Sequence, residues 1–178
     1  MAFIDTGAAD ERPNHDRVFD ARPGALAAWQ QLNGAIKAGM DLRRYELVTL
    51  AAARRLRSSY CCLAHGGVLA ERFLGEDGVA DVFRDHHAAG LDEADVAVMD
   101  LAERVVDDAT AITQEDVDHL RSLGLSDADV LDVVVAAAAR CFFSKVLDGV
   151  GAQADTSYAE LPPALRDLLA VGRPIEAA

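Results

Sequence analysis

A cysteine, a histidine and a glutamate stand at spacings that would let them form an activated nucleophile. Cys61 and His65 are four residues apart, so on a helix they share one face and lie close enough to exchange a proton. The thiolate is the reactive form of cysteine, and its population depends on such neighbours. Glu46, on the preceding segment, can reach the imidazole and complete the set. These three residues predict a catalytic thiol.

The helix that carries Cys61 is expected to begin at Ser58 or Ser59, either of which can act as an N-cap. Cys61 then lies in the first turn, where unpaired backbone N–H groups and the helix dipole stabilise an anion. If residues 46–73 instead formed one unbroken helix, this support for a thiolate would be lost.

The rest of the chain has helical periodicity and no strand-like alternation. Asp41 is expected to cap a helix, and the segment from Asp127 is expected to form a long apolar helix with Phe142 pointing inward. Residues 1–22 are predicted to be an extended or partly disordered arm. Residues 23–178 are predicted to form a single all-α domain of about six to eight helices. Three further helix starts carry patterns similar to capping boxes: Asp92 with Asp95, Thr113 with Asp116, and Ser126 with Asp129.

The composition narrows the classes of partner. The 178 residues are 51% hydrophobic, and 30 acidic against 17 basic residues give a net charge of −13. This charge argues against nucleic acid, which requires a basic surface, and against anionic lipid. Neither a signal peptide nor a membrane-spanning run is recognisable. The three cysteines lack secreted disulfide spacing, so a reduced cytoplasmic location is expected.

The segment from Tyr45 to Leu69 resembles the carboxymuconolactone decarboxylase family, in its branch related to alkyl hydroperoxidase D. In that branch a glutamate precedes a helix with Cys-x-x-Cys, and a histidine follows four residues after the second cysteine. Glu46, Cys61 and His65 match these positions. The tail from Ala109 to Gly151 is similar to the closing helices of the peroxidase-related members. The resemblance implies the alkyl hydroperoxidase D-like fold and a homo-oligomer, either a trimer or a hexamer.

One departure from the family pattern changes the expected chemistry. The first cysteine of the pair falls on Ser58, which cannot resolve a sulfenic acid as a disulfide but can cap the helix or hydrogen-bond to a Cys61 thiolate. A histidine found in some members falls on Tyr60, which leaves Ser58 and Tyr60 in supporting roles. Cys62 is a candidate redox partner, yet a disulfide between consecutive residues would distort the peptide. Cys141 is expected to be a buried apolar residue.

The favoured function is a thiol-dependent peroxidase or related oxidoreductase, with no cofactor, that reduces hydroperoxides through Cys61 and needs an external thiol reductant. His65 and Glu46 are expected to activate Cys61. A first alternative is a cofactor-free lyase that acts on a lactone or small carboxylate, with His65 as acid or base and Arg54, Arg55 and Arg57 as candidate cations. A second alternative is a non-catalytic redox-responsive protein.

A metal site is a weaker hypothesis. It would combine Cys61 and His65 with His86 or His87, but zinc generally needs three or four ligands. The pair His86 and His87 is expected to face solvent, so no metal is assigned.

Overall fold

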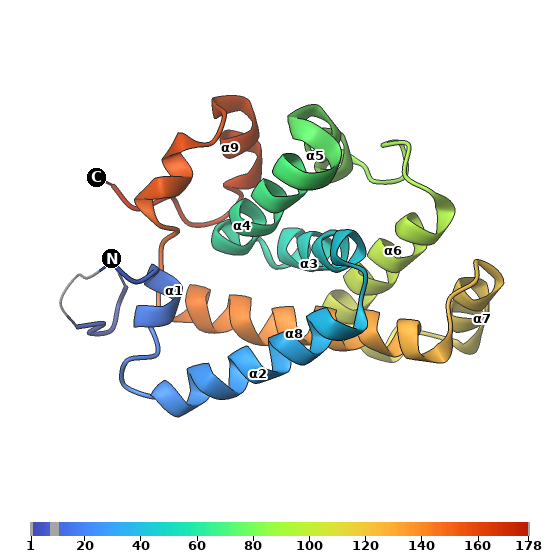
Figure 1. The fold of residues 1–178 in the computed structure, drawn as a ribbon, viewed down its shortest axis with the longest axis horizontal. Helices are drawn as coiled ribbons and strands as arrows, with labels where there is room; N and C mark the ends of the chain where they lie inside the picture. Colours follow the sequence, from blue (N-terminus) through green and yellow to red (C-terminus); the bar gives the residue numbers. More distant parts are fainter. Residues whose placement is uncertain (1, 8–10, 178) are drawn as a thin grey trace.

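Capping side chains and glycines set the helix boundaries of the chain. The computed structural model describes residues 2–7 and 11–177. Short π and 3-10 segments follow α4, α6 and α8, at Ala70–Leu74, Ala109–Ala111 and Thr156–Glu160. The α-helices are α1 (Asn14–Arg17), α2 (Pro23–Gly39), α3 (Leu42–Leu56), α4 (Ser59–Leu69), α5 (Gly75–Arg84), α6 (Glu93–Asp108), α7 (Gln114–Ser122), α8 (Asp127–Gly149) and α9 (Pro163–Leu169) (Figure 1).

The expected caps are present at the starts of four helices. Asp41 accepts a hydrogen bond from the Arg44 backbone N–H, 3.0 Å away, at the start of α3. Asp92 accepts one from Asp95 at the start of α6. Full reciprocal capping boxes begin α7, at Thr113 and Asp116, and α8, at Ser126 and Asp129. An Asp therefore serves in the position where Glu or Gln is usual.

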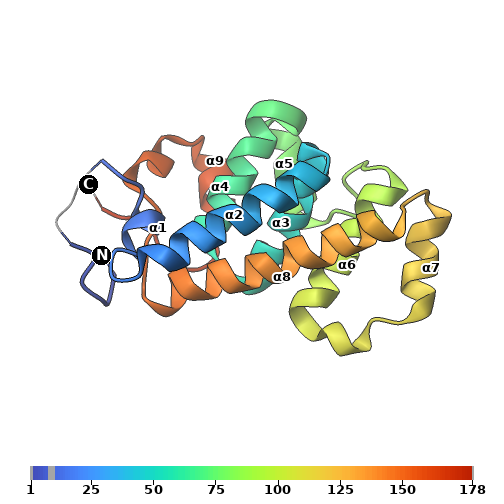
Figure 2. The same cartoon turned by 60° about the horizontal axis from the view of Figure 1, so that its bottom comes forward.

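Helix α3 lies at the centre of the molecule and packs against α4, α6 and α8, while α2 runs along α8 (Figure 2). Small side chains line much of this core, which lets the helix backbones approach closely. The prediction of one all-helical compact domain is confirmed. Core alanines on α3, α6 and α8 include Ala51, Ala52, Ala53, Ala102, Ala136 and Ala137.

Among the described residues no helix has the length and hydropathy needed to cross a membrane.

The segment expected to be an extended arm contains the short helix α1 and contributes to the core. Val18 and Phe19 are buried, and the Phe19 ring stacks on Phe143 with ring centroids 6.2 Å apart. The Asn14 backbone N–H donates to Asp155 Oδ1, 2.7 Å away, so the segment is attached to the chain that follows α8. The apolar pair in this segment explains why it folds onto the domain.

The prediction that Phe142 points inward is wrong. Its side chain is 48% exposed, whereas the adjacent Phe143 is 7% exposed. Consecutive helical residues point about 100° apart, so only one of the two rings can enter the space between α8 and α2. Phe143 occupies it, stacked on Trp29 with ring centroids 4.5 Å apart.

A sharp break separates α3 from α4 and decides where Cys61 lies. Arg57 adopts a left-handed conformation, with φ of 56°, and Ser58 is extended. The C-terminal segment covers this break, because the Gly172 N–H donates to Ser59 Oγ over 2.7 Å. A Cβ on Gly172 would lie 2.1 Å from the Arg57 carbonyl oxygen, so only glycine allows this approach. Residues 46–73 are therefore not one helix, and Cys61 lies in the first turn of α4, as predicted.

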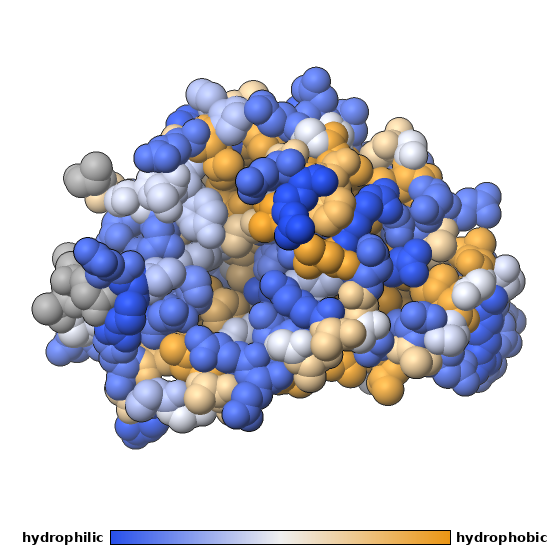
Figure 3. All heavy atoms as spheres, viewed as in Figure 1, coloured by the Kyte–Doolittle hydropathy of each residue, from blue (hydrophilic) through white to orange (hydrophobic). Residues whose placement is uncertain are grey.

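Hydrophilic residues cover much of the face shown in Figure 3, and hydrophobic residues gather mainly in its upper middle. This surface agrees with the acidic composition of the chain.

Candidate functional site

Glu46 and His65 form a buried pair between α3 and α4. The Nδ1 of His65 lies 2.5 Å from Oε2 of Glu46. Glu46 is 2% exposed, and its carboxylate accepts a hydrogen bond from Nδ1–H when the ring is neutral. This tautomer leaves Nε2 with a free lone pair, so Nε2 can act as a base. Burial lowers the pKa of His65 to about 4, even though Glu46 opposes that shift. His65 is therefore neutral at neutral pH.

The lowered pKa of His65 predicts that stability declines in mild acid. An unfolded histidine binds a proton near pH 6.5, whereas the folded chain accepts one only near pH 4. The unfolded state therefore gains protons first, and the free energy of unfolding should fall as the pH drops from 6.5 to 4. For this group the loss approaches about 3 kcal/mol, and it is complete below pH 4. Urea denaturation across this range measures it.

The control for this prediction is His65→Gln, whose amide can donate to Glu46 but does not titrate. Its unfolding free energy should depend less steeply on pH in the same range. Equal pH dependence in the two proteins would show that another group is responsible.

The sulfur of Cys61 accepts two hydrogen bonds from α8. Ser144 Oγ donates to it from 3.1 Å, and Arg140 Nη1 donates from 3.5 Å. Donors and a cation that face a sulfur favour its anionic form. Among the described residues no hydrogen bond joins Cys61 to His65. The sequence prediction that His65, Glu46 and the helix start activate the thiol did not include Arg140 and Ser144, which make the direct contacts with the sulfur.

Arg140 is a buried cation and makes no ion pair with a carboxylate in the described part of the chain. It is 4% exposed, and its Nη2 donates to the Tyr45 hydroxyl over 3.2 Å. Tyr45 in turn donates to Asn33 Oδ1, 2.7 Å away. Burial opposes the charge of Arg140, but Cys61 and Tyr45 outweigh that effect and raise its pKa. A buried cation needs a compensating charge, and the Cys61 sulfur is placed to supply it.

A cavity of about 160 Å³ connects these side chains. Cys61, His65 and Arg140 line it together with Lys37 on α2. Its other walls are mostly aromatic rings, from Trp29, Tyr45, Tyr60, Phe143 and Tyr158. The cavity therefore presents a sulfur, a neutral imidazole and two cations to a small molecule.

Tyr60, predicted as a supporting residue, lies on the wall of this cavity. Its hydroxyl donates to Asp155, and His15 Nδ1 lies 2.9 Å from the same oxygen. Burial, followed by the Asp155 hydrogen bond, raises the pKa of Tyr60, so the phenol stays protonated. Burial also lowers the pKa of His15. An imidazole from the N-terminal segment thus stands beside the position where some family members carry a histidine.

The remaining predicted residues, Ser58, Cys62 and Cys141, make no hydrogen bond to the Cys61 sulfur among the described residues. Ser58 occupies the N-cap position of α4, but its side chain makes no capping hydrogen bond, and Ser144 takes the expected place beside the Cys61 sulfur. Cys62 is fully buried, and burial raises its pKa. Cys141 is partly buried, and its pKa is likewise raised by burial. All three cysteines are free thiols.

The arginines considered for the lyase alternative lie outside the Cys61 cavity. Arg54 pairs with Glu103, and Arg55 pairs with Asp107. The arginine that does line the cavity, Arg140, was missed as a site residue, and so was Lys37. The sequence did offer an indication of Arg140, because it is a lone charged residue inside the apolar run of α8.

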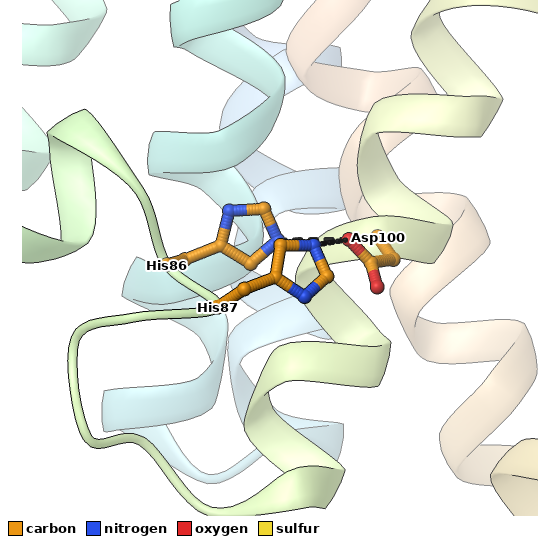
Figure 4. Close-up of side chains that lie close together, drawn as sticks. All are labelled: His86, His87 and Asp100. Carbon is orange, nitrogen blue, oxygen red and sulfur yellow. Dashed lines mark hydrogen bonds and ion pairs between the residues drawn. The ribbon is translucent and has the colours of Figure 1, made fainter.

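His86, His87 and Asp100 converge away from the cavity, between the loop after α5 and helix α6 (Figure 4). The Nε2 atoms of His86 and His87 lie 2.8 Å and 3.0 Å from Asp100 Oδ1. His86 is 3% exposed, so the expectation that both histidines face solvent is wrong for His86. The metal site imagined with Cys61 and His65 does not form from these residues.

The contact of Arg54 with His86 argues against a metal ion at this cluster. Arg54 Nη2 lies 3.1 Å from His86 Nδ1, and a guanidinium can only donate. Nδ1 must then be the acceptor, so the ring proton is on Nε2 and faces Asp100. A metal would need the lone pair of that same Nε2. The cluster instead holds the loop to α6.

Solved structures that share this fold include peroxidase-related proteins. No family model matches the sequence, and no curated protein matches it. A peroxidase-related protein with an alkylhydroperoxidase AhpD core, from Ralstonia eutropha JMP134, is 20% identical over 82% of this chain and 78% of its own, with a TM-score of 0.76. A peroxidase-related protein from Silicibacter sp. TM1040 is 18% identical over 83% and 79%, with a TM-score of 0.77.

The debrominase Bmp8, solved as a cysteine-to-alanine variant with 2,3,4-tribromopyrrole, is also similar. It is 15% identical over 88% of this chain and 82% of its own, with a TM-score of 0.74. At these identities the comparisons establish the fold, and they confirm the predicted alkyl hydroperoxidase D-like architecture. Proteins with this architecture include both peroxidase-related proteins and a debrominase.

Proposed function

We propose that this chain is a member of the alkyl hydroperoxidase D-like branch and acts as a thiol-dependent peroxidase with a single reactive cysteine. The observation that carries the proposal is the Cys61 sulfur, which accepts hydrogen bonds from Arg140 and Ser144 inside a cavity. A buried arginine with no carboxylate partner among the described residues favours a negative charge on that sulfur.

In the proposed reaction the terminal oxygen of a hydroperoxide is transferred to the Cys61 sulfur. The Cys61 thiolate attacks the terminal oxygen of a hydroperoxide, the O–O bond breaks, and an alkoxide leaves with the bonding pair. The sulfur is oxidised by two electrons to a sulfenic acid. His65, which lines the same cavity, takes up the thiol proton at Nε2 and returns it to the alkoxide.

Regeneration requires an external thiol. One thiol displaces water from the Cys61 sulfenic acid to give a mixed disulfide, and a second thiol releases Cys61 as a disulfide forms between the two reductants. Ser58 cannot replace either thiol. Cys62 is a poor substitute because burial raises its pKa and so disfavours its thiolate.

Mass spectrometry after one equivalent of hydroperoxide tests the proposal. We expect sulfenic acid at Cys61 alone, no internal disulfide to Cys62 or Cys141, and return to the thiol when a small dithiol is added. Oxidation of Cys141 or Cys62 in preference to Cys61 would contradict it. Sulfenylation that is never followed by repeated turnover would favour the redox-responsive alternative.

The homo-oligomer, a trimer or a hexamer, stays a prediction. Exposed apolar side chains on α2 and α8 are compatible with subunit contacts: Leu32, Leu131 and Phe142.

A further inference from the structure

We infer that the Cys61 cavity selects a small aromatic hydroperoxide that carries a carboxylate, and that Lys37 recognises the carboxylate. This inference rests on the proposed function for the reaction, but it concerns which molecule enters the cavity. Three features of the described residues support it: the size of the cavity, the chemistry of its walls and the charge around it.

The size and walls of the cavity fit one aromatic ring. Its volume is about 160 Å³, and an apolar cavity of about 150 Å³ holds a single benzene molecule. Trp29 and Phe143 stack with an interplanar angle of 10°, so they present flat apolar surface. Tyr60 and Tyr158 meet edge to face, with ring centroids 5.9 Å apart, on the same lining. Aromatic walls favour a planar ring over a flexible chain.

The charge of the cavity favours an anion. Arg140 and Lys37 line it, and no carboxylate does among the described residues, although the whole chain has 30 acidic and 17 basic residues. Arg140 already faces the Cys61 sulfur and the Tyr45 hydroxyl. Its guanidinium therefore binds the thiol and the Tyr45 hydroxyl rather than the substrate.

Lys37 is the cation that remains available. Its Nζ lies 4.9 Å from the centre of the Tyr45 ring, on the cavity wall, and it makes no ion pair among the described residues. The side chain is exposed, so it can meet the carboxylate of a ligand at the rim while the ring enters below. An ammonium group on a flexible stem suits a carboxylate that enters from solvent.

Trp29 provides a direct readout of binding, because it is the only tryptophan in the chain and it lines the cavity. The experiment uses Cys61→Ser protein, which should do no chemistry, and titrates it with benzoate or with benzamide, a neutral molecule of the same shape. We expect saturable changes in Trp29 fluorescence and about three- to tenfold tighter binding of benzoate. Added salt should reduce the difference.

Lys37→Met keeps the length and apolar stem of the side chain and should remove the preference for benzoate while leaving benzamide binding unchanged. The matched control is Lys145→Met, which changes the other lysine of the chain, an exposed residue on α8 outside the cavity. It should keep the preference. Equal binding of the two ligands, the absence of saturable binding, or a preference that survives Lys37→Met would overturn the inference.

Turnover separates this inference from the proposed function. Cumene hydroperoxide and its para-carboxylate derivative are compared on the wild-type protein, with a dithiol as reductant. Faster consumption of the carboxylate, lost in Lys37→Met, supports both conclusions. Equal consumption overturns the substrate class and leaves the peroxidase intact. If neither peroxide is consumed while benzoate still binds selectively, the peroxidase fails and the ligand class stands.

Discussion

Replacing Cys61 by serine is expected to lower hydroperoxide consumption by a factor on the order of 10³ or more. The reason is chemical, since a serine hydroxyl stays protonated at neutral pH and cannot be oxidised to a sulfenic acid. The environment that favours an anion at this position, with donors from Ser144 and Arg140, remains in the variant. The measurement is loss of hydroperoxide with time in the presence of excess dithiol.

The matched control is Cys141→Ser, which changes a partly buried thiol on α8 that does not line the cavity. It should retain most of the activity. A Cys61→Ser protein that consumed hydroperoxide at the wild-type rate would remove the basis of the proposed peroxidase. If conversion of a lactone survived in Cys61→Ser and disappeared in His65→Gln, the lyase alternative would replace it.

Replacing Arg140 by methionine is expected to slow the alkylation of Cys61 at neutral pH by about tenfold or more, because an opposite charge within a few ångströms of a thiol favours its reactive anionic form. Arg140 Nη1 lies 3.5 Å from the sulfur. The rate of Cys61 modification by iodoacetamide at neutral pH, followed by mass spectrometry, measures this effect directly. Peroxidase activity at neutral pH should fall in parallel.

Two further variants show whether charge is the cause. Arg140→Lys keeps a cation but loses the fork that reaches Cys61 and Tyr45 together, so it should restore only part of the alkylation rate. Arg55→Met removes an exposed arginine that is paired with Asp107, outside the cavity, and should leave the alkylation rate unchanged. A wild-type alkylation rate in Arg140→Met would mean that the charge of Arg140 does not support the thiolate. Circular dichroism checks that each variant is folded.

Local patterns in the chain were enough to predict most of the helices. Capping side chains such as Asp41 and Ser126 act over three residues, so their effect is visible without the fold. The same holds for the position of Cys61 in the first turn of α4, which depends on the break at Arg57 and Ser58. Such short-range signals do not reveal which face of a helix meets which neighbour. Phe142 and Phe143 illustrate the difference, since only packing against α2 decided which ring is buried.

By itself, the sequence determined an all-helical domain, the helix start that places Cys61 in a first turn, and the partnership of Glu46 with His65. Only the tertiary structure decided what touches the sulfur: Arg140 and Ser144 are 79 and 83 residues away from Cys61 in the chain. It likewise brought His15 and Lys37 to the cavity. The physical reason is that caps and helix-face spacings act between near neighbours, whereas a buried charge takes its partner from whichever helix packs against it.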